Sequence, residues 1–482
     1  MRYSLALVLL IFNISAFSQD STALENDRVL ISLEDIFENA KLNHPIIKQS
    51  NLQDRFAEAQ LTGAKGMLDP KIESRYAEKN FKDTEYYKKF YNALKIPVWF
   101  PIDPKIEAYR NTGQYLDGEE YVSASSDYWQ FTAGVSLPIG KGLFIDERRS
   151  MIKQARIYSD IAESEKIKLA NKTLLEITKS YWDWYFASKQ YELMEQSLSI
   201  AEELFRRIKI DYSFGEAAVV DTVQAKITYQ NRLVDYTQAR YDLINSRLKL
   251  SIHLWGENDV PLEISEKAQP TIEHSLWVVP EDSSLNTITD WAHKYHPEIQ
   301  KILAKQKQLE VEEQWNKESL KPELNLSYSF IDAPINIDGL ETPQFGENYK
   351  LGMDFSFPLY LRKERGKLQK TRIYQESVEF ELLQTRQAIA ADIRSTYAEL
   401  ETNRLLSEQY ESLAQNYNRL FQAEMFNIET GESDLFKLNI QQDKYIEAQI
   451  KYLKVLVKFE KLKGQLPFAS GLPYLSYLKL YE

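Results

Sequence analysis

The stretch that decides the fold is residues 143–214, which read LFIDERRSMIKQARIYSDIAESEKIKLANKTLLEITKSYWDWYFASKQYELMEQSLSIAEELFRRIKIDYSF. It contains neither Gly nor Pro and is rich in residues that favour helices. Apolar side chains recur at three- and four-residue steps, as at Ile177, Tyr181 and Tyr185. One uninterrupted helix of this length is roughly 100 Å long, because each residue adds about 1.5 Å. The sequence therefore predicts a long rod with coiled-coil-like packing.

A second stretch without Gly or Pro covers residues 367–430. Each rod is predicted to end at a glycine, Gly215 or Gly431, because glycine adopts the left-handed conformation that closes a helix C-terminus. A second helix then returns beside the first, so each half of the chain forms a helical hairpin. The expected long helices are residues 146–212 and 216–254 in the first half, and 364–428 and 432–463 in the second.

These two halves form a tandem repeat, because short motifs recur in both in the same order. The matching pairs are His44-Pro45 with His296-Pro297, Asp69-Pro70 with Lys321-Pro322, Ser136-Leu137-Pro138 with Ser356-Phe357-Pro358, and Gly215-Glu216 with Gly431-Glu432. The separation is the same for the first two pairs and then shrinks, so the first half carries about 32 additional residues between its two expected strands.

Four strands are predicted from alternating apolar and polar residues, most clearly at Tyr349, Leu351, Met353 and Phe355. They cover residues of about 70–80, 127–138, 323–331 and 348–358. Each is close to the length that crosses a membrane when tilted. Four strands cannot close a barrel, and a strand edge left open in lipid costs several kcal/mol for each unsatisfied backbone group. We therefore expect three copies to form one barrel of twelve strands.

The additional residues of the first half fall within positions 81–126 and include many aromatic side chains, interrupted by Pro97, Pro101 and Pro104. They are predicted to form an ordered extracellular loop. Alternatively, Ile106 to Arg110 and neighbouring residues extend the first strand or add a short hairpin above the membrane, since the prolines argue only against a central strand.

The N-terminus has the pattern of a secretory signal peptide: a charged start, an apolar run from Leu5 to Ile14, and Ala16-Phe17-Ser18 before the expected cleavage site. Cysteine is absent, so no disulfide framework or lipid-modified cysteine is expected. The apolar run is too short to span a bilayer. A net charge of -12 disfavours nucleic acid as a partner, because binding to a duplex relies on clustered Lys and Arg.

Long helices, glycine turns and paired strands, all duplicated behind a signal peptide, resemble the TolC family of outer membrane factors over residues of about 32–465. The motifs that carry this resemblance are Leu42-Asn43-His44-Pro45, the two strand-ending prolines Pro138 and Pro358, and the helix-tip segments that begin at Gly215 and Gly431. The expected division is a signal peptide at 1–18, a first repeat at 19–255, an inter-repeat equatorial segment at 256–284, a second repeat at 285–465 and a C-terminal equatorial tail at 466–482.

The resemblance implies a homotrimer of mixed α and β structure, with an outer-membrane barrel in contact with lipid and a helical tunnel in the periplasm. It also implies two partners, a periplasmic adaptor protein and an inner-membrane transporter, in a tripartite efflux or type I secretion system. Passive conduction of the exported substrate is the expected function. The alternative is a periplasmic coiled-coil scaffold that never enters the membrane. Apolar strand faces argue against a scaffold, because a soluble rod has no need of them.

The tips of the helical hairpins are the expected site of adaptor contact and of gating. The adaptor contact is assigned to Tyr212, Gly215, Glu216, Asn427, Thr430 and Gly431, and the gate to Asp221, Glu432, Asp434 and Lys437. In the family, acidic residues often form a ring at the second tip. Here Lys437 occupies one of those positions, so Glu432 and Asp434 either replace the ring or serve only as helix caps.

No enzymatic activity, cofactor or metal site is expected. His293 and His296 are the one pair of histidines at a spacing compatible with metal binding, but His296 begins a helix before Pro297. Glu312, Glu313 and Asp183 lie on amphipathic helices, where such charges usually face solvent or form ion pairs. Phosphate-binding, nucleophile-elbow and zinc-protease motifs are absent from the sequence.

Overall fold

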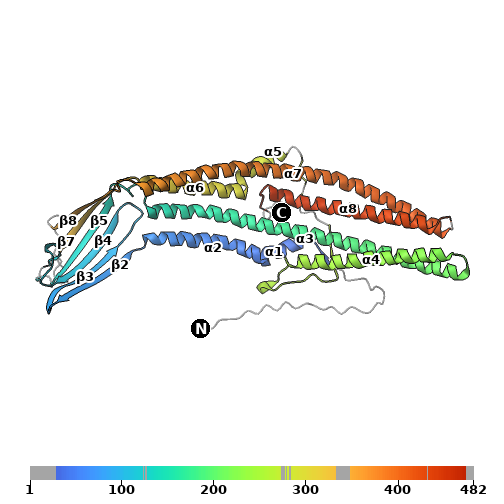
Figure 1. The fold of residues 1–482 in the computed structure, drawn as a ribbon, viewed down its shortest axis with the longest axis horizontal. Helices are drawn as coiled ribbons and strands as arrows, with labels where there is room; N and C mark the ends of the chain where they lie inside the picture. The colour runs from blue at the N-terminus through green and yellow to red at the C-terminus, as the bar shows by residue number, and fades with distance from the viewer. Residues whose placement is uncertain are drawn as a thin grey trace, which may run out of the picture.

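The computed structural model describes residues 29–473, apart from 123, 125–126, 273–276, 278, 282–283, 333–347 and 431. Figure 1 shows an elongated molecule with one sheet at an end and long helices that run away from it. The expected signal peptide and most of the expected C-terminal tail lie outside the described residues, as does Gly431.

Two helices of 68 residues form the frame: α3 (Glu147–Phe214) and α7 (Arg362–Glu429). Asp146 begins α3 as an N-cap, since its carboxylate accepts a hydrogen bond from the Arg149 amide at 2.8 Å. The returning helices are α4 (Val219–Ser251), packed along α3, and α8 (Leu435–Ala469), packed along α7. Each repeat is thus a helical hairpin whose tip lies far from the sheet (Figure 1).

Shorter helices support the sheet end of each rod. In the first repeat α1 (Leu33–Asn43) and α2 (Pro45–Lys65) lead to the sheet, and α2 packs on α3. The second repeat has α5 (Leu285–Tyr295) and α6 (Pro297–Glu318), and α6 packs on both α3 and α7. His44 and His296 cap α2 and α6: in each, the imidazole Nδ1 accepts a hydrogen bond from a backbone amide at 3.2 Å. The repeated His-Pro motif therefore starts a helix in both halves.

The expected end of the last helix at residue 463 is wrong, because α8 continues through Pro467 to Ala469. A proline removes one backbone hydrogen bond inside a helix. Here that loss is offset by burial, since Leu466, Pro467 and Ala469 are all buried in the core. The segment expected to begin the C-terminal tail is therefore helical.

The prediction of four strands is also wrong, because the sheet has six: β2 (Lys71–Phe81), β3 (Thr84–Lys95), β4 (Asp103–Thr112), β5 (Trp129–Pro138), β7 (Glu323–Asp332) and β8 (Tyr349–Ser356). Their order across the sheet is the order of the chain, and all neighbours are antiparallel. The region expected to be a loop is largely the hairpin β3–β4, inserted between β2 and β5 (Figure 1).

The prolines do not prevent this hairpin because of where they fall. Pro97 and Pro101 lie in the turn between the strands, and Pro104 lies near the start of β4. The turn is closed by the Ile96 amide, which donates to the Pro104 carbonyl at 2.9 Å. A proline at a strand start removes little from the ladder, so β4 pairs fully with β3 and β5 beyond it.

Two apolar cores lie where the helices of each repeat meet. In the first, Tyr181 and Trp184 of α3 are fully buried near Phe37, and the Tyr181 hydroxyl donates to the carbonyls of Ile31 and Thr271. Ile31 belongs to β1 (Val29–Ile31), which pairs in parallel with β6 (Ala268–Pro270). The second core contains Ile299, Ile393, Leu400 and Leu466. Among the described residues, no helix combines the length and apolar composition that a membrane crossing requires.

Candidate functional site

The first helix tip has the geometry that its glycine predicts. Gly215 has φ +80° and ψ 9°, and the Glu216 amide donates to the Asp211 carbonyl at 2.9 Å. No atom lies within 4 Å of where a Cβ would be placed on Gly215, so only its backbone conformation requires glycine. Helix α4 starts at Val219, and the Asp221 carboxylate accepts a hydrogen bond from the Ala218 amide at 3.0 Å. Asp221 therefore stabilises the start of α4.

At the second tip, hydrogen bonds stabilise both the end of α7 and the start of α8. The Thr430 amide donates to the Phe426 carbonyl, and the Glu432 amide donates to the Asn427 carbonyl at 2.8 Å. Asp434 is the N-cap of α8, since its carboxylate accepts a hydrogen bond from the Lys437 amide at 2.9 Å. The Lys437 ammonium lies 3.8 Å from the same carboxylate. Asp434 thus has the capping geometry that was one of its two expected roles, and Lys437 partly neutralises it.

The two tips meet around a cavity of about 490 Å³ that opens between them. Asp221, Glu216 and Asp434 line it, together with Asp211 and Arg207, which the sequence analysis did not select. The other residues assigned to the tips, Tyr212, Asn427, Thr430, Glu432 and Lys437, do not line this cavity. Four carboxylates face one guanidinium, so the space between the tips is acidic.

Large apolar side chains are exposed at the same end of the molecule. Phe214 is 77% exposed, Val220 67%, Phe426 65% and Phe436 62%. Isolated exposed apolar residues are normal, but several at one end of a rod mark a contact surface. This surface surrounds the residues expected to touch a partner, including Tyr212, which is 47% exposed.

Polar side chains join the two hairpins above the tips. Arg232 of α4 is buried and forms an ion pair with Asp443 of α8. The Asn439 amide group donates to the Thr228 hydroxyl at 3.1 Å. Elsewhere along their length α4 and α8 contact each other little. These bonds add to the apolar contacts that α3 makes with α8 of the second hairpin, among them Leu204 with Leu438.

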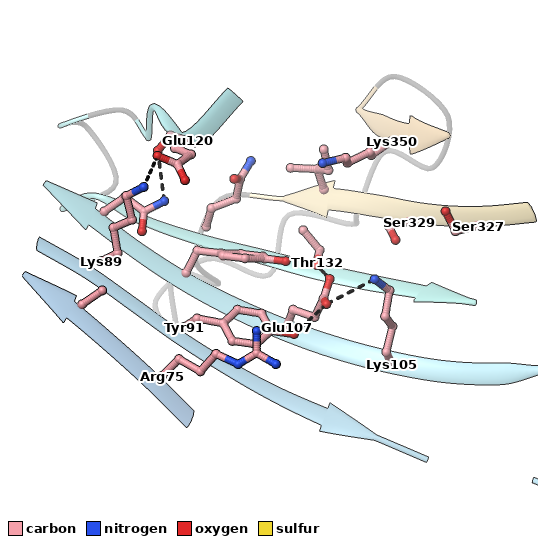
Figure 2. A pocket seen from close by; sticks show the side chains of 15 residues that line it. Arg75, Lys89, Tyr91, Lys105, Glu107, Glu120, Thr132, Ser327, Ser329 and Lys350 are labelled. Atoms are coloured by element: carbon pink, nitrogen blue, oxygen red, sulfur yellow. Dashed lines mark hydrogen bonds and ion pairs between the residues drawn. The ribbon is translucent and has the colours of Figure 1, made fainter. Parts of the chain in front are cut away.

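A cavity of about 630 Å³ lies on the polar face of the sheet. Figure 2 shows its side chains, six of which come from the inserted strands β3 and β4 and the others from β2, β5, β7, β8 and the segment after β4. At its centre the buried carboxylate of Glu107 accepts hydrogen bonds from Tyr91 and Thr132, each at 3.0 Å, and from Lys105 at 3.2 Å. These four residues come from three neighbouring strands, so the cluster depends on their register. The sequence analysis missed it for that reason.

The groups considered for catalysis and metal binding have structural roles. Glu313 pairs with Arg372 at 3.0 Å and Lys317 at 2.9 Å, Glu312 accepts from Thr371 at 3.0 Å, and Asp183 pairs with Lys461 at 2.5 Å. Within the described part of the chain, no three His, Cys, Asp or Glu side chains come together as metal ligands. Burial lowers the pKa of His296 to about 4, because desolvation disfavours the charged imidazolium.

Burial and, to a smaller extent, the nearby His253 lower the pKa of His44 to about 4. The two imidazoles are stacked, with His44 Nε2 3.4 Å from His253 Nδ1. Both rings lie beside the first apolar core, where α2 begins and α4 ends. The pair is therefore a candidate for pH sensitivity and not for catalysis.

Part of the chain matches known proteins in sequence. Residues 105–256 match the family described as outer membrane efflux protein. "Outer membrane protein TolC" of Escherichia coli (strain K12) is 24% identical over 176 residues, and that match spans 36% of this chain and 35% of TolC. The corresponding protein of Salmonella enteritidis is 23% identical over 199 residues, spanning 40% of each chain. The sequence matches thus cover less than half the length of these relatives.

The fold is shared over most of the chain. The CmeC outer membrane channel of Campylobacter jejuni superposes with a TM-score of 0.64 at 14% identity, covering 93% of this chain and 88% of CmeC. The MtrE outer membrane channel of Neisseria gonorrhoeae, in its open state, gives 0.63 at 13%, covering 92% and 90%. Residues 105–256 thus match the family described as outer membrane efflux protein, and the described chain shares its fold with solved outer membrane channels.

Proposed function

We propose that three copies of this chain form an outer-membrane channel-tunnel that conducts exported substrate passively. The chain is an outer membrane protein whose helices extend into the periplasm. Substrate enters between the helix tips, passes along the helices and leaves through the barrel. A periplasmic adaptor contacts the helix tips and an inner-membrane transporter supplies the energy, in a tripartite efflux or type I secretion system.

The sheet carries this proposal, because its two faces differ in polarity. One face presents Phe131, Val135, Tyr328, Leu351 and Met353, which are between 39% and 71% exposed. The other face holds the charged cavity described above. An isolated sheet would gain nothing by exposing such a face to water, whereas a barrel wall places it in lipid and the polar face around an aqueous lumen.

Closure of the barrel requires other copies of the chain. β2 and β8 are the edges of the sheet, and they run in opposite directions, so β8 of one copy can pair with β2 of the next in an antiparallel ladder. Six strands from each of three copies give 6 × 3 = 18 strands. This count replaces the expected twelve. Because barrel diameter grows roughly linearly with strand number, the lumen is about 1.5 times as wide as that of a twelve-stranded barrel.

The helices support the same assembly. Along α4, every seventh residue from Val220 to Leu248 is apolar and exposed: Val220, Ile227, Val234, Tyr241 and Leu248. Another set at the same spacing, which includes Ala225 and Ala239, is buried within the chain. A heptad stripe is the surface that another helix covers in a coiled coil. A neighbouring copy is the natural occupant, because it would close the helices into a tunnel.

Opening of the tunnel requires the tips to separate, and the bonds between α4 and α8 oppose that movement. We expect Asp443→Ala to loosen the tips, since it leaves the buried Arg232 without its main partner. Single-channel recordings should show a several-fold higher conductance than wild type. Thr222→Ala is a matched control nearer the tip, because its hydroxyl bonds only within α4. Equal conductance in Asp443→Ala and wild type would contradict this gate.

Cysteine labelling tests the membrane assignment, since the sequence contains no cysteine. Lys350→Cys and Leu351→Cys are neighbours in β8 that point to opposite faces. In isolated outer membranes, a water-soluble maleimide should label Lys350→Cys and leave Leu351→Cys unlabelled. Equal labelling at both positions would favour the alternative, a periplasmic scaffold outside the membrane.

A further inference from the structure

The connection between β4 and β5 is far longer than two neighbouring antiparallel strands require. A hairpin turn needs about two to five residues, whereas residues 113–128 separate Thr112 from Trp129. We call residues 113–122 of this connection the strap. Like β3 and β4, the strap belongs to the additional residues of the first repeat. The insertion therefore supplies two strands and also a segment that is not part of the sheet.

The strap begins with a tight turn against the start of β3. Gly113 has φ +135°, and a Cβ placed on it would lie 2.6 Å from the Tyr87 Cα, so this position requires glycine. The Tyr115 amide then donates to the Tyr86 carbonyl at 3.0 Å, and the two tyrosine rings stack with their centroids 4.6 Å apart. These contacts fix the first part of the strap at the end of the sheet that lies away from the helices (Figure 1).

The strap then returns over the polar face of the sheet. Lys89 of β3 and Asn111 of β4 are directly opposite each other, and both line the cavity on that face. The Asn111 side-chain amide donates to the Glu120 carbonyl at 3.0 Å, and the Lys89 ammonium forms an ion pair with the Glu120 carboxylate. Figure 2 shows Glu120 directed toward Lys89. One residue of the strap is thus bound to two strands, on the face that carries the polar side chains.

Burial indicates that the strap is packed on one side and open on the other. Asn111, beneath the strap, and Val122, at its end, are buried. Tyr115 and Tyr121 of the same segment are exposed. The strap is therefore a second layer in front of the sheet. Packed layers of chain are about 10 Å apart, so the strap takes up to roughly that depth of the space in front of the polar face.

We propose that the strap is a constriction at the outer mouth of the barrel and sets the upper size of the solutes that leave through it. The proposal rests on the proposed function in one respect, that the polar face of the sheet lines the lumen. Three copies then place three straps around one mouth. The strands of the insertion widen the barrel, whereas its strap narrows the exit. Small molecules pass such a mouth, and bulky ones have to displace the strap.

The test measures how large a reagent can reach the lumen from outside intact cells. The sequence contains no cysteine, so Ser327→Cys places a single thiol on the polar face. Ser327 pairs with Ser136, far along β5 from Trp129 and the strap. Lys82→Cys, in the exposed turn between β2 and β3, places a thiol outside the barrel. Polyethylene-glycol maleimides of increasing size are added, and small ones should label both thiols, whereas large ones should label only Lys82→Cys.

Two changes to the strap should raise the size limit. Replacement of residues 114–121 by two glycines leaves a connection too short to cover the polar face. The smallest reagent that the natural strap excludes should then label Ser327→Cys at least tenfold faster. Glu120→Lys places two ammonium groups together and should raise the same rate at least threefold. This variant keeps the test informative if the shortened strap reduces assembly.

Exchange of the two charges is the matched control for Glu120→Lys. Lys89→Glu together with Glu120→Lys forms the ion pair in the opposite sense, so the size limit should return to that of the natural strap. Glu85→Ala removes a carboxylate that binds Lys88 at 2.7 Å within β3 and should leave the limit unchanged. A limit that the charge exchange does not restore would contradict the role of the Lys89–Glu120 pair.

The outcomes separate the constriction from the proposed function. Equal labelling of Ser327→Cys by every reagent, with the natural strap and with both altered straps, would overturn the constriction alone, provided that Lys82→Cys is labelled from outside. Lys82→Cys that is labelled only after the cells are broken would contradict the proposed function, and the constriction with it. A size limit that rises in both altered straps supports the proposal.

Discussion

The two repeats share one helical frame and differ in the sheet. α3 and α7 each have 68 residues, and both repeats begin their supporting helix with a His-Pro motif. The first repeat, however, contributes β2 to β5, whereas the second contributes β7 and β8. A hairpin returns the chain to the end from which it left, so two strands can be added without moving the helices. The sheet can therefore gain strands while the long helices keep their arrangement.

The largest expected loss of stability comes from a charge placed on the apolar face of the sheet. Such a charge tests whether the inserted hairpin lies in the membrane with the other strands. Leu351→Arg in β8 and Ile106→Arg in β4 both place a charge on the apolar face. Each should cost about 2–4 kcal/mol, as for an arginine at the midplane of an outer-membrane barrel. Urea unfolding of the purified trimer measures the cost. Gln130→Arg on the polar face of β5 is the control and should cost less than half as much.

A small loss of unfolding free energy in Ile106→Arg, together with a large loss in Leu351→Arg, would contradict a shared place in the membrane for β4 and β8. The hairpin would then stand outside the lipid, and the sheet would have membrane and non-membrane parts. Equal costs would show that both repeats contribute strands to one membrane wall.

The next effect compares the two helix-capping histidines across pH. His44 and His296 both have a pKa of about 4 in the folded chain, below the usual 6.5, because burial favours the neutral ring. Stability that depends on neutral imidazole is complete above pH 6.5 and is lost as pH falls toward 4, by on the order of 3 kcal/mol for each group. Asparagine also caps helices, so His44→Asn and His296→Asn should reduce this acid sensitivity.

The two repeats are expected to differ in how much each variant reduces the acid sensitivity. Because His253 stacks on His44 and His296 has no such neighbour among the described histidines, His44→Asn should reduce the acid sensitivity more. Urea midpoints at pH 7 and pH 4.5 measure it. Identical pH dependence in wild type and both variants would exclude these histidines as the cause.

The smallest effect concerns the first tip. Gly215→Val should cost about 1–2 kcal/mol, because a residue with a Cβ is strained at φ +80°. Gly366 in α7 is the matched control, since it also has open space around it but lies within a helix. Gly366→Ala should stabilise the chain by about 0.5–1 kcal/mol. Thermal unfolding of both variants checks the signs, and a neutral Gly215→Val would count against the tip geometry.

Sequence patterns predicted the parts of the fold that are local. The long helices follow from uninterrupted periodicity, Gly215 from the conformation of a helix end, and β8 from strict alternation. A loop was preferred to the hairpin β3–β4 because Lys88 and Asn92 interrupt the apolar face of β3, and because Pro97, Pro101 and Pro104 are typical of loops. Their effect depends on falling at a turn and a strand start, which only the pairing reveals.

The candidate sites were harder to predict because their residues come together only in the tertiary structure. Asp221 and Asp434 were found from their place beside the tip glycines, but Asp211 and Arg207 join them only when the two hairpins come together. Glu107 is an ordinary alternating residue in the sequence. Its burial and its partners follow from the register of β3, β4 and β5, which composition and spacing do not encode.

In the proposed channel, the inserted hairpin widens the barrel that three copies share. Electron cryo-microscopy of the detergent-extracted protein, at a resolution that separates strands, tests it most directly. We expect three copies and eighteen strands in one closed antiparallel barrel, with β3 and β4 in the wall, since each chain supplies six strands. A closed barrel of twelve strands, with the hairpin folded outside it, would contradict the account.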